Sequence, residues 1–455
     1  MEPDFDLSTL SHAQKDALIR KLLPLVAQLE GAVVRIAQLE ARIAELERPP
    51  KTPANSSTPP SKAAKPARPP SKNPNRRTRP GSARSLAENP DRTVEAHLAA
   101  CPHCQADFPA ARQTPQEVYD RIELPPVKPD VTRVHLFGGR CGCCGQRATA
   151  SAPSGLEPGS PFGRSVEAMV IYLHYAQAIG LERLRAVMSE IFGLSISEGA
   201  LSNILARARA PLTAAVLPIR ASVVASRVVC SDETSVRVAG RTWWEWVFVT
   251  GTGVLHLIRP SRGAAVPRDV FGDVRPGVWV SDALGSQRGH AKAWQMCLAH
   301  LLRDAQYAID CGDRAFSAKL RRLLLRAIAI GRRRADLKNS TLVQYRADLD
   351  RRLDRIMAVV PQGRDGERLR KRMARDRASL FLFVTDRAVP ATNNISERHL
   401  RPSVIFRKVT NGFRAEWGAE VYAAFRSVIS SAKLASKTVL DAIKTALATT
   451  VALPG

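Results

Sequence analysis

Hydrophobic residues near the N-terminus recur in alternating steps of four and three, the spacing of a coiled-coil seam. The seam residues are Leu18, Leu22, Leu25, Leu29, Ala32, Ile36, Leu39, Ile43 and Leu46. Pro24 can kink or restart the helix, so the stretch after it is the safer part of the pattern. Residues 1–48 therefore predict a coiled-coil helix through which the chain forms a homodimer or a higher oligomer. The alternative is a single amphipathic helix packed on its own protein.

A second helical pattern covers residues 160–220. Its first apolar face contains Val166, Met169, Val170 and Leu173. A turn at Phe192–Leu194 follows a second helix, and Ser197 can cap a third. Two helices joined by a tight glycine turn predict a helix-turn-helix-like segment. A plain helical hairpin fits the same pattern.

Four runs between residues 225 and 304 predict β-strands. They are Val228–Thr234, Thr242–Thr250, Val254–Ile258 and Gly277–Asp282, with a short helix near Val266–Phe271. Three antiparallel strands, a crossover and a fourth strand form the beginning of a ribonuclease H-like α/β sheet. Residues 225–304 would be the first part of this core, and residues 386–455 the second part, with C-terminal helices. The predicted fold class is thus multidomain α/β.

The charge of the chain indicates what kind of molecule it binds. The 455 residues include 68 Lys and Arg against 42 Asp and Glu, which gives a formal net charge of +26. Such a charge favours nucleic acid as the binding partner. Twenty basic residues against seven acids lie between Arg314 and Arg377, within a helical pattern at 305–385. We expect this range to be a basic helical insertion in the core that can track DNA, although a solvated helical face is the plainer interpretation.

The other basic stretch is rich in proline. Between Pro49 and Pro90 there are nine basic residues and one acid, so residues 49–93 predict a disordered basic linker. Such a linker either holds DNA loosely or is inert. No run of 18 uncharged apolar residues occurs, so we expect no membrane span and a cytoplasmic, nucleoid-associated protein.

Cysteines mark a separate segment at residues 94–150. Cys101 and Cys104 form one Cys-x-x-Cys pair, and Cys141 and Cys144 form another. Two such pairs are typical of a structural, tetrahedral Zn²⁺ site, for which disulfides are the alternative. Cys143 does not fit the spacing and is left out.

Three acids are candidates for catalysis. Asp232 and Asp282 end two predicted strands that would be neighbours, and two such carboxylates repel each other unless a divalent cation neutralises them. Mg²⁺ is the ion that matches oxygen donors next to phosphate. Glu397, in a helix that Asn393 or Asn394 can cap, would complete a site for two Mg²⁺ ions. Taken singly, each acid is more simply a surface carboxylate.

Several short motifs carry a resemblance to a known family. They are Ser231–Thr234, Trp243–Trp246, Ser281–Asp282, Cys297–His300, Asn393–Arg398 with Arg401–Pro402, and Arg407–Lys408 followed by Gly412–Arg414. In this order they resemble the insertion sequence 66 family of bacterial DDE transposases. The chain departs from that pattern at Thr392, where many members carry Asp before the two Asn. That position is outside the triad.

The resemblance implies a function and a set of site residues. Asp232, Asp282 and Glu397 would be the metal-binding triad, which hydrolyses the phosphodiester at transposon ends and transfers the 3′-OH into target DNA. The DNA-binding or site-supporting residues would be Cys297, His300, Asn393, Asn394, Arg398, Arg401, Arg407 and Lys408. For Cys297 and His300, a core thiol beside a satisfied imidazole is an equally good interpretation. Companion transposition proteins are possible partners.

Two other functions remain as alternatives. One is a catalytically silent, zinc-containing DNA-binding regulator, against which the presence of all three acids argues. The other is a ribonuclease H-like nuclease that cleaves without joining, which a coiled coil and a long basic insertion fit less well.

Overall fold

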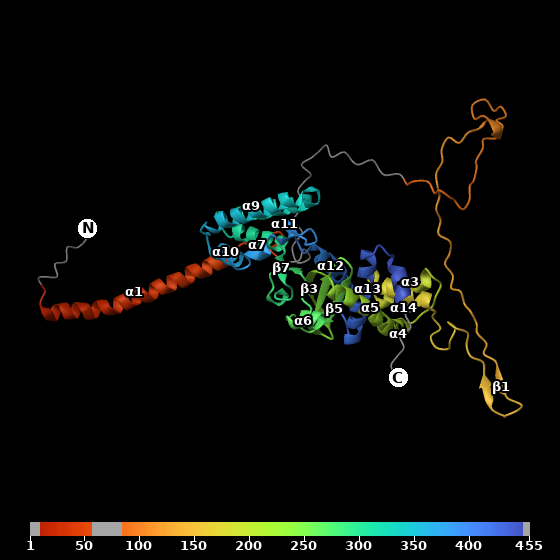
Figure 1. Ribbon diagram of the computed structural model, residues 1–455, viewed down its shortest axis with the longest axis horizontal. Helices are drawn as coiled ribbons and strands as arrows, with labels where there is room; N and C mark the ends of the chain where they lie inside the picture. The colour runs from red at the N-terminus through yellow and green to blue at the C-terminus, as the bar shows by residue number, and fades with distance from the viewer. Residues whose placement is uncertain (1–9, 57–83, 449–455) are drawn as a thin grey trace. The chain divides into compact units, whose positions relative to one another are not determined.

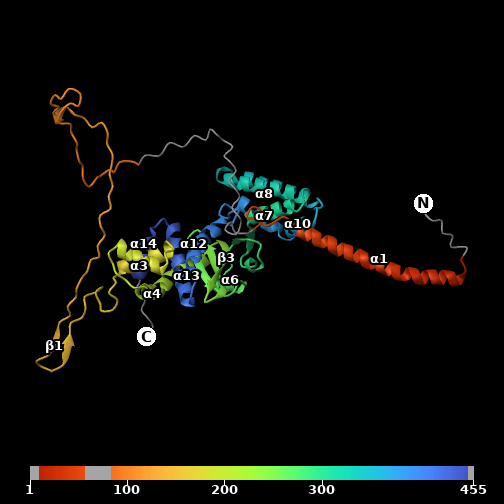
Figure 2. The same cartoon turned by 180° about the vertical axis from the view of Figure 1, so that it is seen from behind.

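The computed structural model describes residues 10–56 and 84–448 (Figures 1 and 2). The chain divides into two compact units. The larger unit takes Met1–Ala64, Phe162–Ile179 and Asn203–Gly455, and the smaller takes Lys65–Pro161 and Gly180–Ser202. The larger unit has a mixed α/β architecture, in agreement with the fold class expected from the sequence.

A five-stranded mixed sheet is the centre of the larger unit. Its strands are β3 (Val228–Val238), β4 (Arg241–Val249), β5 (Val254–Arg259), β6 (Val278–Ser281) and β7 (Ala293–Met296). Their order across the sheet is β5-β4-β3-β6-β7, with β3, β4 and β5 antiparallel and β6 and β7 parallel to β3. The four predicted strands and the helix α6 (Ala265–Phe271) are present. The fifth strand, β7, was not expected.

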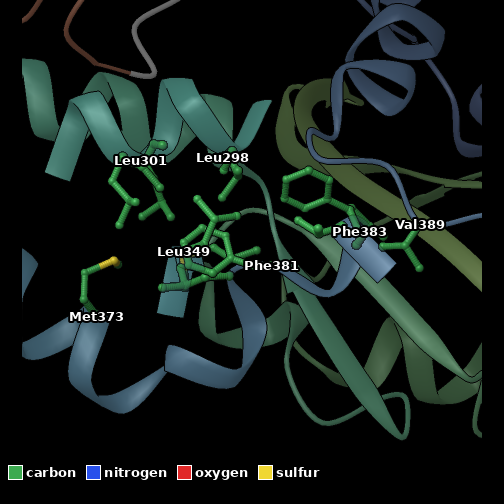
Figure 3. Close-up of a cluster of buried hydrophobic side chains, with 14 of the residues drawn as sticks. Leu298, Leu301, Leu349, Met373, Phe381, Phe383 and Val389 are labelled. Carbon is green, nitrogen blue, oxygen red and sulfur yellow. The ribbon is translucent and has the colours of Figure 1, made fainter. Parts of the chain in front are cut away.

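Both faces of the sheet are buried. One face packs Trp246, Phe248 and Trp279 against α5 (Arg209–Val224) and α6. The other face packs against α7 (Leu298–Asp310) and the helices that follow it. Figure 3 shows part of this second core, where Leu298, Leu301, Leu349, Met373, Phe381, Phe383 and Val389 converge. Burial on both sides explains the continuous apolar runs within the strands, such as Trp246–Val249 and Val278–Val280.

The range between β7 and Glu397 is helical. It contains α7, α8 (Phe316–Arg333), α9 (Asn339–Met357), α10 (Arg364–Arg375) and α11 (Leu382–Thr385), with short 3₁₀ turns at Arg334–Asp336 and Arg377–Ser379. Figure 1 shows α9, α10 and α11 gathered around α7 near β7, and Figure 2 shows α8 beside α7. The buried Asp313 caps α8 by accepting hydrogen bonds from the N–H groups of Phe316 and Ser317.

Two long helices complete the core: α12 (Asn394–Thr410) and α13 (Glu416–Leu434), followed by α14 (Val439–Ala448). β5 is an edge strand, and α13 covers that edge. The Ser431 and Ser427 hydroxyls accept hydrogen bonds from the N–H groups of Val254 and His256 at 3.0 and 2.8 Å. These serines satisfy backbone donors that an exposed edge would leave open to pairing with another chain.

The N-terminal helix α1 (His12–Leu46) is continuous through Pro24, so the expected kink or restart did not occur. Its seam is exposed from Leu22 onward, and apolar residues outside the seam, including Ile19, Val26 and Val33, widen the exposed stripe. By length and composition, His12–Glu40 could also cross a membrane, with a mean hydropathy of 1.4. Our expectation considered uncharged runs alone, whereas α1 reaches this hydropathy with charges interspersed. One such helix is weak support for a span, and no membrane is indicated.

The segment after α1 differs from the linker that we expected. Residues 57–83 lie outside the described residues. Residues 51–56, however, form a turn packed on α7, and Asn55 is only 6% exposed. The Asn55 side chain accepts a hydrogen bond from the N–H of Thr52 and donates one to Asp310 at 2.9 Å. These side-chain bonds hold a segment whose composition alone predicted disorder.

The smaller unit contains little regular structure. It includes a 3₁₀ turn (Ala110–Arg112), the two-stranded hairpin of β1 (Gly138–Arg140) and β2 (Arg147–Thr149), and α3 (Leu181–Glu190). The described segment 118–136 forms no strands, and its apolar residues are exposed.

The helical segment at 160–220 consists of α2 (Arg164–Ile171), a π-helical turn (Tyr172–Ala176), α3, α4 (Glu198–Arg207) and α5. Gly193 has a φ of 61°, which suits the glycine of the turn between α3 and α4. The Ser197 hydroxyl accepts a hydrogen bond from the N–H of Ala200 at 3.2 Å, so the predicted cap of α4 is present.

Candidate active site

Asp232 and Asp282 lie at the same level of two neighbouring parallel strands. The paired residues of β3 and β6 end with Cys230 and Val280, and each aspartate lies two residues further along its strand. Adjacent strands are about 4.8 Å apart, so the two carboxylates are close neighbours. Asp282 directly follows β6, as expected. Asp232 lies within β3, which continues to Val238, and not at the end of its strand.

The electrostatic environment of Asp232 disfavours its charge. Burial raises the pKa of Asp232 to about 8, and the negative charges of Glu233 and Asp282 act in the same direction. The charge of His300 and a hydrogen bond from the Glu233 N–H oppose this shift. A carboxyl group that has lost water and faces two other acids is stabilised as an anion by a nearby cation.

Glu397 approaches the site from the first turn of α12. Its Oε1 atom lies 3.8 Å from Nε2 of His300 and 3.8 Å from Nη1 of Arg303, both on α7. His300 also feels the charges of Asp282 and Asp232. All three predicted acids therefore influence one imidazole, which comes from a fourth segment of the chain.

Asn393 joins the segments that carry these residues. Its buried side chain donates a hydrogen bond from Nδ2 to the carbonyl of Ser231, next to Asp232, at 2.7 Å. Its backbone N–H donates to Sγ of Cys297 at 3.1 Å, and its Oδ1 accepts from the Ser396 hydroxyl at 2.7 Å. Asn393 occupies the N-cap position of α12, but its side chain connects β3 to α12 instead of capping the helix. Asn394, the other candidate cap, is exposed.

Cys297 and His300 support the site from the start of α7. Cys297 is buried at the residue before the helix begins. Burial alone would lower the pKa of His300, but the neighbouring Cys297 thiol and the charges of Asp282 and Asp232 raise it to about 9. The raised pKa favours the protonated form of this imidazole, which would place a positive charge near the acids.

Sequence reasoning missed a second acidic site next to Asp232. Glu233 is buried on the opposite face of β3, as strand alternation requires. It accepts hydrogen bonds from Arg262 at 3.0 Å and from Gln287 at 2.6 Å. Burial raises its pKa, and Asp282 adds to this. The only signal in the sequence was a second acid after Asp232, because both partners come from distant loops.

The basic residues predicted around α12 take two different positions. Asn394, Arg398, Arg401 and Lys408 are exposed, and their spacing places them along one face of the helix. Arg407 is held against the sheet: its guanidinium donates hydrogen bonds to the Ser235 carbonyl and, at 3.1 Å, to the Thr234 hydroxyl. Arg407 thus anchors α12 to β3.

The two cysteine pairs form loops with the same backbone pattern. In the first loop the N–H of Cys101 donates to the Ala106 carbonyl, and the Cys101 carbonyl accepts from the N–H of Gln105. In the second loop Cys141 makes the same two bonds, with Gln146 and Gly145. Backbone N–H groups within each loop lower the pKa of the first thiol. Each loop therefore favours a thiolate.

Metal ligands are not assembled in this structure. Within residues 10–56 and 84–448, no group of three or more His, Cys, Asp or Glu side chains is gathered closely enough to hold a metal ion. This applies to the four paired cysteines and to the three acids, where Glu397 faces His300 and Arg303.

Comparison with known proteins agrees with the motifs. No curated protein matches the chain. A family model described as Transposase IS66 family matches residues 159–421, which include the sheet, the helices after β7, and α12. All three acids and the residues around them lie within this match, which covers more than half of the chain. The chain therefore belongs to the IS66 family of transposases.

Proposed function

We propose that this transposase uses Asp232, Asp282 and Glu397 to hydrolyse the phosphodiester at transposon ends and to transfer the resulting 3′-OH into target DNA. The observation that supports the proposal is the set of hydrogen bonds made by Asn393, which connects β3, the start of α7 and α12. Glu397 then contacts His300, and the charges of Asp232 and Asp282 act on the same imidazole. Separate surface carboxylates would have no reason to converge from three elements.

The sheet supports a ribonuclease H-like core. Three antiparallel strands are followed by a crossover through α6 and two strands parallel to the first. In this topology Asp232 is on the central strand and Asp282 follows its neighbour. The helices from α8 to α11 then form the insertion between the second acid and Glu397.

Mg²⁺ fits the donor set of the site. Three carboxylates supply hard oxygen ligands, and the raised pKa of Asp232 indicates a need for positive charge. Two Mg²⁺ ions would be held by Asp232, Asp282 and Glu397. When bound, such ions activate the attacking oxygen and neutralise charge at the phosphate.

The side chains of the site differ in how firmly they are held, and this difference suits the binding of metal and DNA. Asp232 lies on β3 and Asp282 directly follows β6. Within the described residues, the ion pairs of Glu397 are long, at 3.8 Å to Arg303 and to His300. Glu397 can therefore turn towards the aspartates without breaking a close ion pair. That movement would free Arg303 to bind phosphate as DNA enters.

DNA would be held on both sides of the acids. Membership of the family implies a DNA partner. The exposed stripe of Asn394, Arg398, Arg401 and Lys408 on α12 and the excess of basic residues between Arg314 and Arg377 are suited to phosphate contacts. A chain of this kind would act in the cytoplasm on the nucleoid, alone or with companion transposition proteins.

A structural Zn²⁺ site would be formed by Cys101, Cys104, Cys141 and Cys144. The matching loops and their stabilised thiolates fit the chemistry of zinc, which binds cysteine as the thiolate. Binding would bring the two loops together and order a segment that has little regular structure of its own.

The direct test of the proposal is cleavage of DNA that carries the ends flanking the gene. We expect the purified full-length chain to nick these ends in Mg²⁺ or Mn²⁺. Asp282→Asn should lower the rate by at least about a hundredfold, since removing one group that stabilises transition-state charge has effects of this size. The matched control, Asp273→Asn, changes an exposed carboxylate on the same unit and should keep full activity. Full activity of Asp282→Asn would refute the triad.

The two alternatives give different results in this assay. A nuclease would cut the ends but leave no joined product with a target plasmid. A DNA-binding regulator would retard the ends in a gel but cut nothing in any divalent metal.

A further inference from the structure

A hollow of about 360 Å³ extends from Arg303 away from the acids. One side is formed by α7 and α8, with Arg303, Gln306, Asp310 and Arg321. The other side is formed by Thr52 and Asn55, from the turn that follows α1. Arg303 connects the hollow to the catalytic acids, because its Nη1 atom is 3.8 Å from Oε1 of Glu397.

The hollow is electropositive despite the presence of an acid. Asp310 is engaged by two amides: Gln306 donates to its Oδ1 at 2.8 Å, and Asn55 donates to its Oδ2 at 2.9 Å. Among the acids that the structure describes, Arg303 pairs with Glu397 alone, at 3.8 Å. Arg321 is half-buried and forms no ion pair with any acid in the described parts of the chain. Two guanidinium groups thus face a single carboxylate that is already hydrogen-bonded.

The wall contributed by the N-terminal segment is held in place. Asn55 is buried, and Lys51 lies over the ring of Tyr307 on α7 at 5.4 Å from its centroid. Arg48 is 3.4 Å from Asp365 on α10. The segment between α1 and residue 56 is therefore attached to the same helix that carries His300 and Arg303.

We propose that this hollow binds one backbone phosphate of the DNA strand whose neighbouring phosphate lies at Asp232, Asp282 and Glu397. The inference rests on the proposed function and assigns a phosphate subsite to Arg321 and Arg303. Guanidinium groups bind phosphate through paired, charge-assisted hydrogen bonds, whereas the Thr52 hydroxyl and the Asn55 and Gln306 amides already bond within the hollow and hold its shape. Because Thr52 and Asn55 follow α1, the subsite would also connect the oligomerisation helix to the bound strand.

The test combines one protein variant with uncharged phosphates in the DNA. Full-length chain is titrated with end DNA in Ca²⁺, using a series in which single phosphates near the cut are replaced by methylphosphonate. We expect methylphosphonate at one position of the series to weaken binding of the wild-type protein by about tenfold, which is the effect of losing one charge-assisted contact. Arg321→Gln should weaken binding to unmodified DNA by a similar factor and lower the slope of log K against log salt by about 1.

The decisive result is the combination of the two changes. In the Arg321→Gln variant, methylphosphonate at the sensitive position should cause no further loss of affinity, because the contact is already lost. The matched control is Arg322→Gln, the exposed neighbour on α8, which should leave the position-specific effect intact. Thermal unfolding of both variants excludes a folding defect, and Arg321→Lys should recover part of the affinity.

Two results would overturn the inference. The first is an Arg321→Gln variant that behaves like Arg322→Gln. The second is that the losses of affinity caused by Arg321→Gln and by methylphosphonate multiply at every DNA position. The proposed function fails separately: a wild type that shows the position-specific effect in Ca²⁺ but cuts nothing in Mg²⁺ would retain the subsite and refute the triad chemistry.

Discussion

At the scale of single residues, Asn393 determines the geometry of the candidate site more than any of the acids. It is buried, and its side chain and backbone contact Ser231, Cys297 and Ser396, which belong to three different elements. A buried amide with these partners tolerates little movement, since each lost hydrogen bond leaves an unsatisfied polar group. Asn393 therefore positions both Asp232 and Glu397.

Replacing Asn393 should damage both stability and activity. We expect Asn393→Ala to lower the free energy of unfolding by about 2 kcal/mol, because the Ser231 carbonyl and the Ser396 hydroxyl lose their partner. Urea denaturation measures this loss, and single-turnover cleavage should slow at saturating Mg²⁺. Asn394→Ala is the matched control, since its side chain is exposed. Equal behaviour of the two variants would contradict the positioning role.

The sequence predicted the candidate site unevenly at this scale. The acids were found because carboxylates after apolar runs are visible in the chain, and the register of β3 and β6 brings Asp232 and Asp282 together as expected. The site around Glu233 was not found, because Arg262 and Gln287 come from loops whose paths depend on tertiary packing. Arg407 was expected to bind DNA or to support the site, and in the structure it is bonded to β3.

At the scale of elements, the strands with strong apolar runs were predictable, while the edges were not. β7 has only the four residues Ala293–Met296 and exists because it pairs with β6. β3 continues past Asp232 to Val238 because β4 pairs with it along that whole stretch. Which strands pair depends on the tertiary structure, and the local sequence of a short or polar strand is a weak predictor of that pairing.

The two cysteine loops provide the prediction for this scale. We expect native mass spectrometry to find one Zn²⁺ on the full-length chain and none on the Cys101→Ser, Cys104→Ser double variant, because two thiolates cannot hold a structural site. Cys143→Ser should keep the metal, since Cys143 lies outside the pairs. Zinc retained by the double variant, or lost by Cys143→Ser, would refute the assignment.

At the scale of the whole molecule, α1 exposes an apolar stripe that the described chain leaves uncovered. Leu29 and Ile36 are 65% and 55% exposed, which is unfavourable unless another copy covers them. We expect the chain to self-associate through this stripe. In each subunit, α1 is followed by the turn that Asn55 bonds to α7. Two catalytic units would then be connected through their N-terminal helices, as the pairing of two DNA ends requires.

Charges placed in the stripe should separate the subunits. Light scattering of Leu29→Glu, Ile36→Glu should give the mass of one chain, since two carboxylates cannot be buried in an apolar interface. Gln28→Glu, Gln38→Glu adds the same charge outside the seam and should leave the assembly intact. An unchanged mass for the first variant, or binding of the wild type to lipid vesicles instead of to itself, would contradict this role of α1.

Metal rescue at the scissile phosphate tests the central claim most directly. After the cut is mapped, the end DNA is made with sulfur in place of one non-bridging oxygen at that phosphate. If Asp232, Asp282 and Glu397 hold metal against it, cleavage should fall by at least about a hundredfold in Mg²⁺, which prefers oxygen ligands, and should recover in Mn²⁺, which tolerates sulfur better. Equal cleavage of both substrates in Mg²⁺, with no gain from Mn²⁺, would contradict the account.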